Sequence, residues 1–320
     1  MPELLSVENL EVHFPIHAGI LKRKVGAVRA VDGVSFTIGR GETLGLVGES
    51  GCGKSTTGLA LLGLVKPTAG HVAFDGAEVQ GFTHAALKAY RRRMQVVFQD
   101  PFSSLNPRQR VRDAIRAALD IHHVGTRKER EAEVARLMER VGLRRDQAGN
   151  FPHQFSGGQR QRIGIARALA LKPDLIICDE PVSALDVSVQ AQILNLLADL
   201  QRDLGISYLF ISHDLGVVEH ISHRVAVMYL GKVVEIAPKA EIFAAPTHPY
   251  TELLIKSAPT LDPRQRHKYS ARSDDVPSAT RKPSGCPFHP RCPLATEICK
   301  TTEPPLTPRP DGRLAACHHR

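Results

Sequence analysis

The chain has 320 residues, of which 42% are hydrophobic, and its 42 Lys and Arg against 33 Asp and Glu give a formal net charge of +9. This size allows one large domain with an appendage or two domains, and a positive charge spread along the chain suits an anionic membrane face, nucleotides or nucleic acid as well as a generally basic surface. The longest apolar runs fall far short of the roughly 20 residues that span a bilayer, and the N-terminus lacks a signal-peptide pattern, so we expect a cytoplasmic protein without a transmembrane segment.

Two strands are predicted near the N-terminus, over residues 4–14 and 30–38, because apolar residues alternate in both segments. We expect these two strands to pair antiparallel. The basic, glycine-containing segment 15–29 between them is predicted to be a loop. Phe14 ends the first strand, where an aromatic ring can either stack on a purine or belong to the core.

A glycine-rich loop follows the apolar segment 43–47, a predicted buried strand, and precedes a helix with one apolar side. It matches the phosphate-binding pattern G-x-x-x-x-G-K-S/T, in which backbone N–H groups and a helix N-terminus surround a phosphate. Lys54 supplies a cation for the β- and γ-phosphates, and the Ser55 hydroxyl is placed to bind Mg²⁺. The predicted ATP-binding residues of this loop are Gly48, Glu49, Ser50, Gly51, Cys52, Gly53, Lys54, Ser55 and Thr56.

The middle of the chain alternates short apolar strands with helices. Strands are predicted over 72–74, 95–98, 175–178, 208–211, 224–229 and 232–236, and amphipathic helices over 160–170 and from about 187 to 204. Apolar residues at helical spacing predict a mostly helical insertion over about residues 100–158. This alternation predicts an α/β fold with a mostly parallel sheet covered on both faces and an antiparallel β part.

Four polar signals follow predicted strands: the phosphate loop, Gln99, Asp179-Glu180 and His213. Ligands of open α/β sheets bind at the carboxyl ends of the strands, so we expect these signals to converge. Mg²⁺ would be held by Ser55, Gln99 and Asp179. Glu180 would polarise the water that attacks the γ-phosphate, Gln99 would bridge metal and water, and His213 would hold the water in line. The alternatives are a helix N-cap for Asp179-Glu180 and an ordinary polar residue at position 213.

A second anion site is predicted at Ser156, Gly157, Gly158 and Gln159, where two glycines open a helix. One chain cannot easily direct both anion sites at one γ-phosphate, whereas a second subunit packed head to tail can. The complete set resembles the ATP-binding subunit of ABC transporters: a Walker A loop at 48–55, Gln99 as the Q-loop, a signature at 155–159, a Walker B segment at 175–180, Asp186 in the D-loop, and switch His213. The resemblance implies that two ATP molecules are sandwiched between two subunits.

Within that family the segments 48–53, 97–101, 180–188 and 247–251 resemble the dipeptide and oligopeptide permeases, in particular their second ATPase subunit. The resemblance implies ATP-driven peptide uptake at the cytoplasmic face of the inner (plasma) membrane. The implied partners are a sister ATPase, two transmembrane permease subunits, which dock near residues 99–105, and an extracellular or periplasmic peptide-binding protein, with no nucleic acid. The alternatives are an importer of nickel or other small solutes, a soluble ABC-type ATPase without a membrane partner, and a non-catalytic binding module.

The C-terminal part is expected to be an extension, residues 238–320, on a nucleotide-binding domain of residues 1–237. Residues 259–285 are polar and basic and are predicted to be a linker, and His248-Pro249-Tyr250 a turn that packs on the main domain. Cys286, Cys292, Cys299 and Cys317 then crowd together, separated by 5, 6 and 17 residues. Four thiols in a cytoplasmic protein favour a metal site, with zinc, helped by His289, His318 or His319, and unligated or disulfide-bonded thiols as alternatives. The resemblance to the peptide permeases implies a 4Fe–4S cluster at these four cysteines.

Overall fold

The computed structural model describes residues 2–19, 23–79, 81–100, 104–257, 280 and 282–320. The chain forms two compact units that are interleaved in sequence. The first comprises residues 1–2, 39–42 and 81–211, and the second comprises 3–38, 43–80 and 212–320. The sequence-based division at residue 237 therefore does not coincide with a boundary between these units and stays a prediction about function.

The first unit contains a parallel three-stranded portion of sheet, with strand order β8-β7-β6. Its strands are β6 (Met94–Val97), β7 (Leu175–Asp179) and β8 (Ser207–Ser212), close to the predicted segments. β7 and β8 are almost wholly buried, as expected for apolar parallel strands that are covered on both faces. The helices of this unit are α2 (His84–Arg93), α3 (Val111–Ile121), α4 (Arg127–Arg140), α5 (Gly157–Leu169) and α6 (Val187–Leu204), with 3-10 turns at Arg145–Gly149 and Pro152–Gln154.

The segment predicted as a helical insertion, about residues 100–158, contains the helices α3 and α4 among its described residues. α3 and α4 pack on each other and on α5, and they bury the apolar residues that carry the helical periodicity, Val111, Ile115, Leu119, Val134, Leu137 and Met138. A reciprocal capping box starts α4: the Thr126 side chain accepts from the backbone N–H of Glu129, and the Glu129 carboxylate accepts from the N–H of Thr126.

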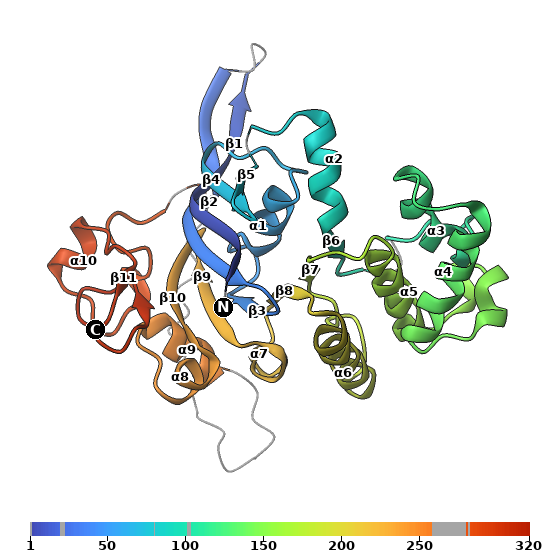
Figure 1. The fold of residues 1–320 in the computed structure, drawn as a ribbon. Coiled ribbons are helices and arrows are strands. Elements are labelled where there is room, and N and C mark those ends of the chain that lie inside the picture. The colour runs from blue at the N-terminus through green and yellow to red at the C-terminus, as the bar shows by residue number, and fades with distance from the viewer. Residues whose placement is uncertain (1, 20–22, 80, 101–103, 258–279, 281) are drawn as a thin grey trace. The chain divides into compact units, whose positions relative to one another are not determined.

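The second unit contains an antiparallel sheet of order β2-β1-β4-β5. Its strands are β1 (Glu3–Ala18), β2 (Arg23–Gly39), β4 (Ala69–Phe74) and β5 (Ala77–Glu78) (Figure 1). The loop predicted over 15–29 is wrong for most of its length, since β1 and β2 run through it. Backbone pairing between neighbouring strands does not depend on apolar side chains, so the exposed ends of these strands give no hydrophobic pattern in the sequence.

The remaining strands of this unit have the order β11-β12-β10-β9-β3. They are β3 (Thr43–Val47), β9 (Arg224–Tyr229), β10 (Lys232–Pro238), β11 (Thr307–Pro308) and β12 (Leu314–Ala315). β3 pairs in parallel with β9, while β9 with β10, β10 with β12 and β12 with β11 pair antiparallel, so the sheet is mixed. The helices are α1 (Lys54–Leu61), α7 (Leu215–Ile221), α8 (Lys239–Ala244), α9 (Pro249–Ser257) and α10 (Glu297–Thr301), with a 3-10 turn at His289–Arg291.

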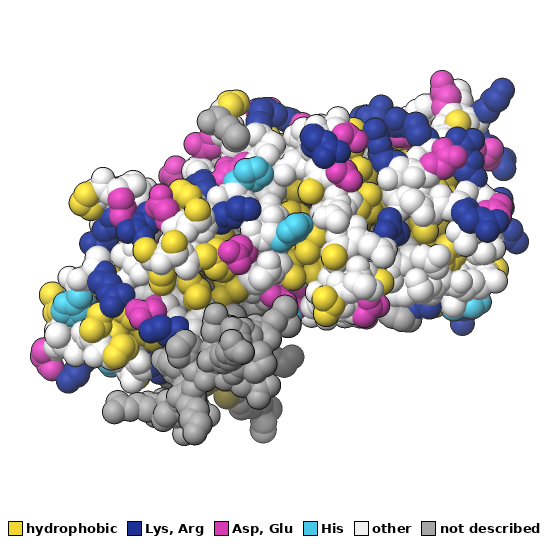
Figure 2. Space-filling view, turned by 90° about the horizontal axis from the view of Figure 1, so that it is seen from below, with side chains coloured by type: hydrophobic (Ala, Val, Ile, Leu, Met, Phe, Trp, Pro, Cys, Tyr) yellow, Lys and Arg dark blue, Asp and Glu magenta, His cyan; other side chains and the backbone are white. Residues whose placement is uncertain are grey.

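The C-terminal extension is joined to this second sheet rather than merely appended to it. Glu235 and Ile236 of β10 pair with Ala315 and Leu314 of β12. Most of the predicted linker, residues 258–279 and 281, lies outside the described residues. None of the described helices is long and apolar enough to cross a membrane. On the face drawn in Figure 2, basic and acidic side chains are intermingled, so no single basic patch on that face accounts for the net charge of +9.

Candidate functional site

The phosphate loop lies between the buried strand β3 and helix α1, as the sequence predicts. Three of its glycines have positive φ angles: 155° at Gly48, 80° at Gly51 and 108° at Gly53. A Cβ atom at Gly53 would lie 2.1 Å from the carbonyl oxygen of Ala30, and one at Gly48 would lie 2.1 Å from that of Met228. The loop is therefore closed against two neighbouring backbones, which leaves room for glycine alone at these two positions.

Lys54 begins helix α1 and is buried. Its Nζ donates to the carbonyl oxygens of Gly48, at 2.8 Å, and Glu49, at 3.0 Å, which holds the ammonium over the loop. Neighbouring Cys52 is buried, and burial raises the pKa of its thiol, so packing describes it better than reactivity. Ser55 is exposed in the first turn of α1.

Glu49 is held by residues from far along the chain, all within the second unit. The Tyr250 hydroxyl accepts a hydrogen bond from the Glu49 backbone N–H, at 3.0 Å. Arg291 forms two hydrogen bonds with the Glu49 carboxylate, each 3.1 Å long. The sequence indicated the packing of His248-Pro249-Tyr250, which is confirmed because His248 and Tyr250 are 1% and 0% exposed. It gave no signal for Arg291, because no local pattern links residues 242 positions apart.

In the first unit, two of the predicted catalytic residues lie together. Gln99 follows β6, Asp179 ends β7, and Glu180 comes next. The Gln99 amide Nε2 donates to Glu180 Oε2 at 2.9 Å. Glu180 has a φ of 46°, unusual for a residue with a side chain, and its N–H donates to the carbonyl of Ile211. This strained turn directs the chain away from β7 directly after Asp179.

The signature segment forms a capping box at the start of α5. The Ser156 hydroxyl accepts from the N–H of Gln159, and the Gln159 side chain accepts from the N–H of Ser156. A Cβ at Gly158 would lie 2.4 Å from Val189 Cγ1, so glycine allows close packing of α5 against α6. Gly157 similarly faces Leu185.

Asp186 caps the N-terminus of α6. Its Oδ1 accepts from the N–H of Val189, at 2.9 Å, and from the Ser188 hydroxyl, at 2.7 Å. These hydrogen bonds, led by that from Val189, lower the pKa of the Asp186 carboxyl below its usual value. The N-cap is therefore its role within the chain. In the second unit, His213 is exposed just after β8, and Phe14 on β1 is 42% exposed, which leaves the Phe14 ring accessible to a planar ligand.

Burial, and then the charges of neighbouring cysteines, raise the pKa of Cys286 and Cys292 above the usual value. Burial raises the pKa of Cys286 to about 11, and the other three cysteines contribute to this rise. The backbone N–H groups of Phe288 and Leu294 act on Cys286 and Cys292 respectively in the opposite direction, as hydrogen-bond donors to sulfur do. Within the described part of the tail, no three cysteine or histidine ligand atoms lie within 4.8 Å of one another.

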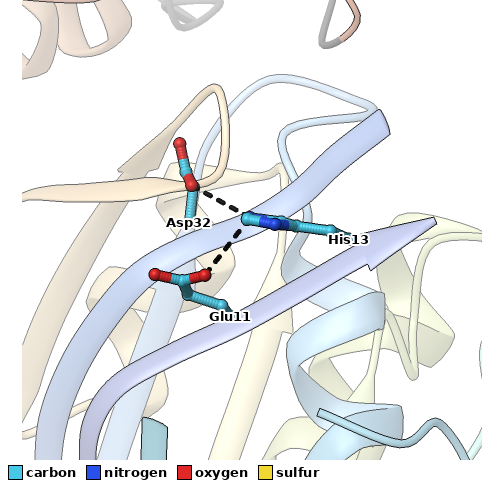
Figure 3. A group of neighbouring side chains, drawn as sticks. All are labelled: Glu11, His13 and Asp32. Carbon is cyan, nitrogen blue, oxygen red and sulfur yellow. Dashed lines mark hydrogen bonds and ion pairs between the residues drawn. The ribbon is translucent and has the colours of Figure 1, made fainter. Parts of the chain in front are cut away.

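A separate acidic and histidine group, Glu11, His13 and Asp32, is drawn in Figure 3. His13 Nε2 lies 3.0 Å from Asp32 Oδ1 and 3.7 Å from Glu11 Oε2. The other Asp32 oxygen accepts from Lys282 Nζ at 3.0 Å, and Lys232 Nζ lies 3.8 Å away. Lys232 Nζ also lies 2.7 Å from Glu303 Oε1, so these residues form an ion-pair network that fastens Lys282 to β2.

Comparison with protein-family models identifies two segments. Residues 31–183 match the model described as ABC transporter, and residues 234–299 match the model described as oligopeptide/dipeptide transporter, C-terminal region. The chain is 56% identical over 317 residues to a probable peptide ABC transporter ATP-binding protein, y4tS, of Sinorhizobium fredii, covering 99% of this chain and 90% of that protein. It is 50% identical over 318 residues to the oligopeptide transport ATP-binding protein AppF of Bacillus subtilis, covering 98% and 97% of the two chains.

Solved structures give the same result for the fold. The structure of cbiO1 from Clostridium perfringens, part of the ABC transporter complex cbiONQ, superposes with a TM-score of 0.67 at 27% identity, over 77% of this chain and 92% of that one. A dimeric, post-hydrolysis structure of the ATP-binding cassette MJ0796 bound to ADP and Pi superposes with a TM-score of 0.65 at 28% identity, over 74% and 99% of the two chains.

Proposed function

This chain belongs to the family of ATP-binding subunits of oligopeptide and dipeptide ABC transporters, ATPases that energise peptide transport, and from that membership we propose how its residues divide the work. The phosphate loop binds the triphosphate, with Lys54 on its β- and γ-oxygens. The Phe14 ring stacks on the purine. Mg²⁺ would be held by the Ser55 hydroxyl and by the Asp179 and Gln99 side chains, which offer the oxygen ligands that this ion prefers.

The hydrolytic step depends on Glu180. The observation that carries this assignment is the 2.9 Å hydrogen bond from Gln99 to Glu180, because it orients the carboxylate and joins the metal-binding amide to the water-activating base. Glu180 Oε2 accepts from Gln99, and the carboxylate would take up a proton from the attacking water. His213, exposed after β8, holds that water and the γ-phosphate in line.

The signature segment acts in trans, on ATP bound by a second subunit. The N-terminus of α5 carries partial positive charge, and Ser156, Gly157, Gly158 and Gln159 give a γ-phosphate close access to it. Asp186 holds the start of α6, onto which α5 is packed through Gly158. The dimeric state of the MJ0796 cassette supports such an arrangement. We propose a heterodimer with a sister ATPase.

The helical insertion receives the membrane subunits, so the protein acts peripherally at the cytoplasmic face of the inner membrane. Its partners are two permease subunits and an extracellular or periplasmic peptide-binding protein, and nucleic acid has no part. We propose that residues 1–237 form the domain that binds and hydrolyses ATP and that residues 238–320 form an extension specific to the peptide-transporter family. The peptide cargo is supported by the relatives described as peptide and oligopeptide transport proteins.

The four C-terminal cysteines fit a 4Fe–4S cluster better than a zinc ion. Around one zinc ion, sulfur atoms lie about 3.8 Å apart, as follows from tetrahedral bonds of about 2.3 Å. Within the described tail no three ligand atoms are that compact, whereas Cys292, Cys299 and Cys317 all lie near enough to Cys286 for their charges to raise its pKa. Backbone N–H groups directed at Cys286 and Cys292 suit sulfurs that ligate a cluster. A bound cluster would tie the polypeptide together at four points, Cys286, Cys292, Cys299 and Cys317.

The test is affinity purification of the full chain from native membranes, followed by identification of bound proteins and reconstitution with them. We expect two permease subunits, a sister ATPase, and ATP hydrolysis that rises when a peptide-loaded binding protein is added. Stimulation by a nickel-loaded binding protein in place of a peptide-loaded one would contradict the cargo. Recovery without any integral membrane protein would contradict the transporter function and favour a soluble ATPase.

A further inference from the structure

A bidentate ion pair joins the Cys-rich tail to the phosphate loop. Arg291 Nη1 and Nη2 each donate to one oxygen of the Glu49 carboxylate, at 3.1 Å. Both side chains are largely shielded, with 17% and 25% of their surfaces exposed. The guanidinium stays charged, because arginine is not deprotonated in proteins. A shielded, bidentate ion pair of this kind fixes the relative position of its two side chains better than an exposed pair does.

An aromatic cluster sets the position of Arg291. Its guanidinium carbon lies 6.0 Å from the ring centre of Tyr229 and 5.8 Å from that of Phe288. These rings and that of Tyr250 pack together, with centres 4.5 to 5.4 Å apart. Tyr250 in turn accepts the Glu49 N–H, so the same cluster holds both the side chain and the backbone of Glu49.

Arg291 is part of the cysteine segment itself. It ends the 3-10 turn His289–Arg291, which lies between Cys286 and Cys292, and its N–H donates to the carbonyl of Phe288. At the other end of the contact, the carbonyl of Glu49 is one of the two acceptors of Lys54 Nζ. A continuous series of direct contacts therefore runs from the cysteine segment through Arg291 and Glu49 to the phosphate-binding lysine.

We propose that Arg291 is a positioning residue for ATP binding, which neutralises Glu49 in the phosphate loop and couples MgATP affinity to the loading of the four-cysteine site. The direction of the effect of Arg291 on MgATP affinity follows from charge. Glu49 places a carboxylate in the loop that receives the anionic triphosphate, and without Arg291 that carboxylate would be uncompensated and would repel it. The positioning role rests on the ATP-binding function of the loop, and the coupling rests in addition on the proposed cluster.

The test measures the Kd of the full chain for MgATP by calorimetry, in Glu180→Gln so that no hydrolysis intervenes. Arg291→Gln is expected to raise the Kd about tenfold, within the usual range of coupling between sites. Glu49→Gln alone is expected to lower the Kd, because Arg291 then adds an uncompensated positive charge near the triphosphate. The double variant is expected to recover most of the affinity that Arg291→Gln loses, since the repelling charge is gone. Lys300→Gln is the matched control, because Lys300 is a tail cation that, among the described residues, forms an ion pair with exposed Glu297, and its loss is expected to leave the Kd unchanged.

Rescue by Glu49→Gln separates this role from a merely structural one, because a second deletion would worsen a loss of packing. An unchanged Kd in folded Arg291→Gln, or a double variant weaker than the single one, overturns the proposal. If Arg291→Gln does not fold, Arg291→Lys takes its place: it keeps the charge but loses the two-pronged geometry. It is expected to raise the Kd about threefold, within the same range, and an unchanged value would again overturn the positioning role.

The coupling has its own readout. MgATP is expected to slow the loss of iron from the full chain to a chelator several-fold, and this protection is expected to disappear in the double variant, because coupling between two sites is reciprocal. Equal rates with and without MgATP would overturn the coupling. Absence of iron from the anaerobically purified chain would overturn the cluster and the coupling together, while the Kd measurements would still decide the role of Arg291.

Discussion

Acidification is expected to destabilise the part of the protein that supports the phosphate loop, through His248. This side chain is buried, and its Nδ1 accepts the N–H of Tyr250 at 3.1 Å. Burial, reinforced by the charge of Arg320 and opposed by a backbone hydrogen bond at Ala316, lowers the pKa of His248 to about 4 from its usual 6.5. The unfolded chain therefore takes up a proton at pH values where the native chain does not.

The sign and magnitude follow from that difference. The stability associated with neutral His248 is fully present above about pH 6.5 and is lost as the pH falls towards about 4. Between about pH 7.5 and about pH 5, this one group should lower the free energy of unfolding by about 2 kcal/mol. The loss continues until the native ring also takes up a proton.

Urea unfolding of the full chain, followed by circular dichroism at the two pH values, measures the effect. His248→Asn is the matched variant, because an asparagine oxygen can accept the N–H of Tyr250 but does not titrate in this range. Subtracting its pH dependence removes the contributions of all other groups. The wild type should lose about 2 kcal/mol more than the variant. Equal losses in the two proteins would refute the reasoning and show that His248 is protonated as readily in the native state.

Four further predictions concern the nucleotide site. Glu180→Gln should keep MgATP affinity, trap a closed dimer and slow turnover about 10²- to 10⁴-fold. Normal steady-state hydrolysis by this variant would contradict the proposed role of Glu180 as the base. Lys54→Ala should lose MgATP affinity and ATPase activity together. Gly53→Ala should abolish nucleotide binding, since its Cβ would lie 2.1 Å from the carbonyl of Ala30 at a φ of 108°, and wild-type affinity in calorimetry would show that the loop can move aside. Ser156→Ala should lower the stability by about 1 kcal/mol through loss of its N-cap. It should reduce hydrolysis far more than this loss explains if Ser156 contacts a phosphate bound by the other subunit, as we propose. A drop in melting temperature alone, with full activity per folded dimer, would show that Ser156 acts only as an N-cap.

Local sequence patterns predicted the elements that depend on neighbouring residues. The phosphate loop, the capping residue Ser156 and the buried strand that ends at Asp179 each have a signature within about ten residues, because turn geometry, capping and burial are local requirements. The prediction failed for residues 15–29, where pairing between β1 and β2, not side-chain pattern, decides the structure. Helices α2 and α7 were not predicted at all.

By itself, the sequence determined the α/β class, the order of the nucleotide-binding motifs, and the family. Only the tertiary structure decided that Gln99 contacts Glu180, that Lys282 joins Asp32, and that the cysteine tail reaches the phosphate loop through Arg291 and Glu49. The physical reason is that each of these contacts joins side chains at least 81 positions apart. Such pairs leave no periodicity or spacing in the chain, and they come into being only when the strands and loops that carry them have packed.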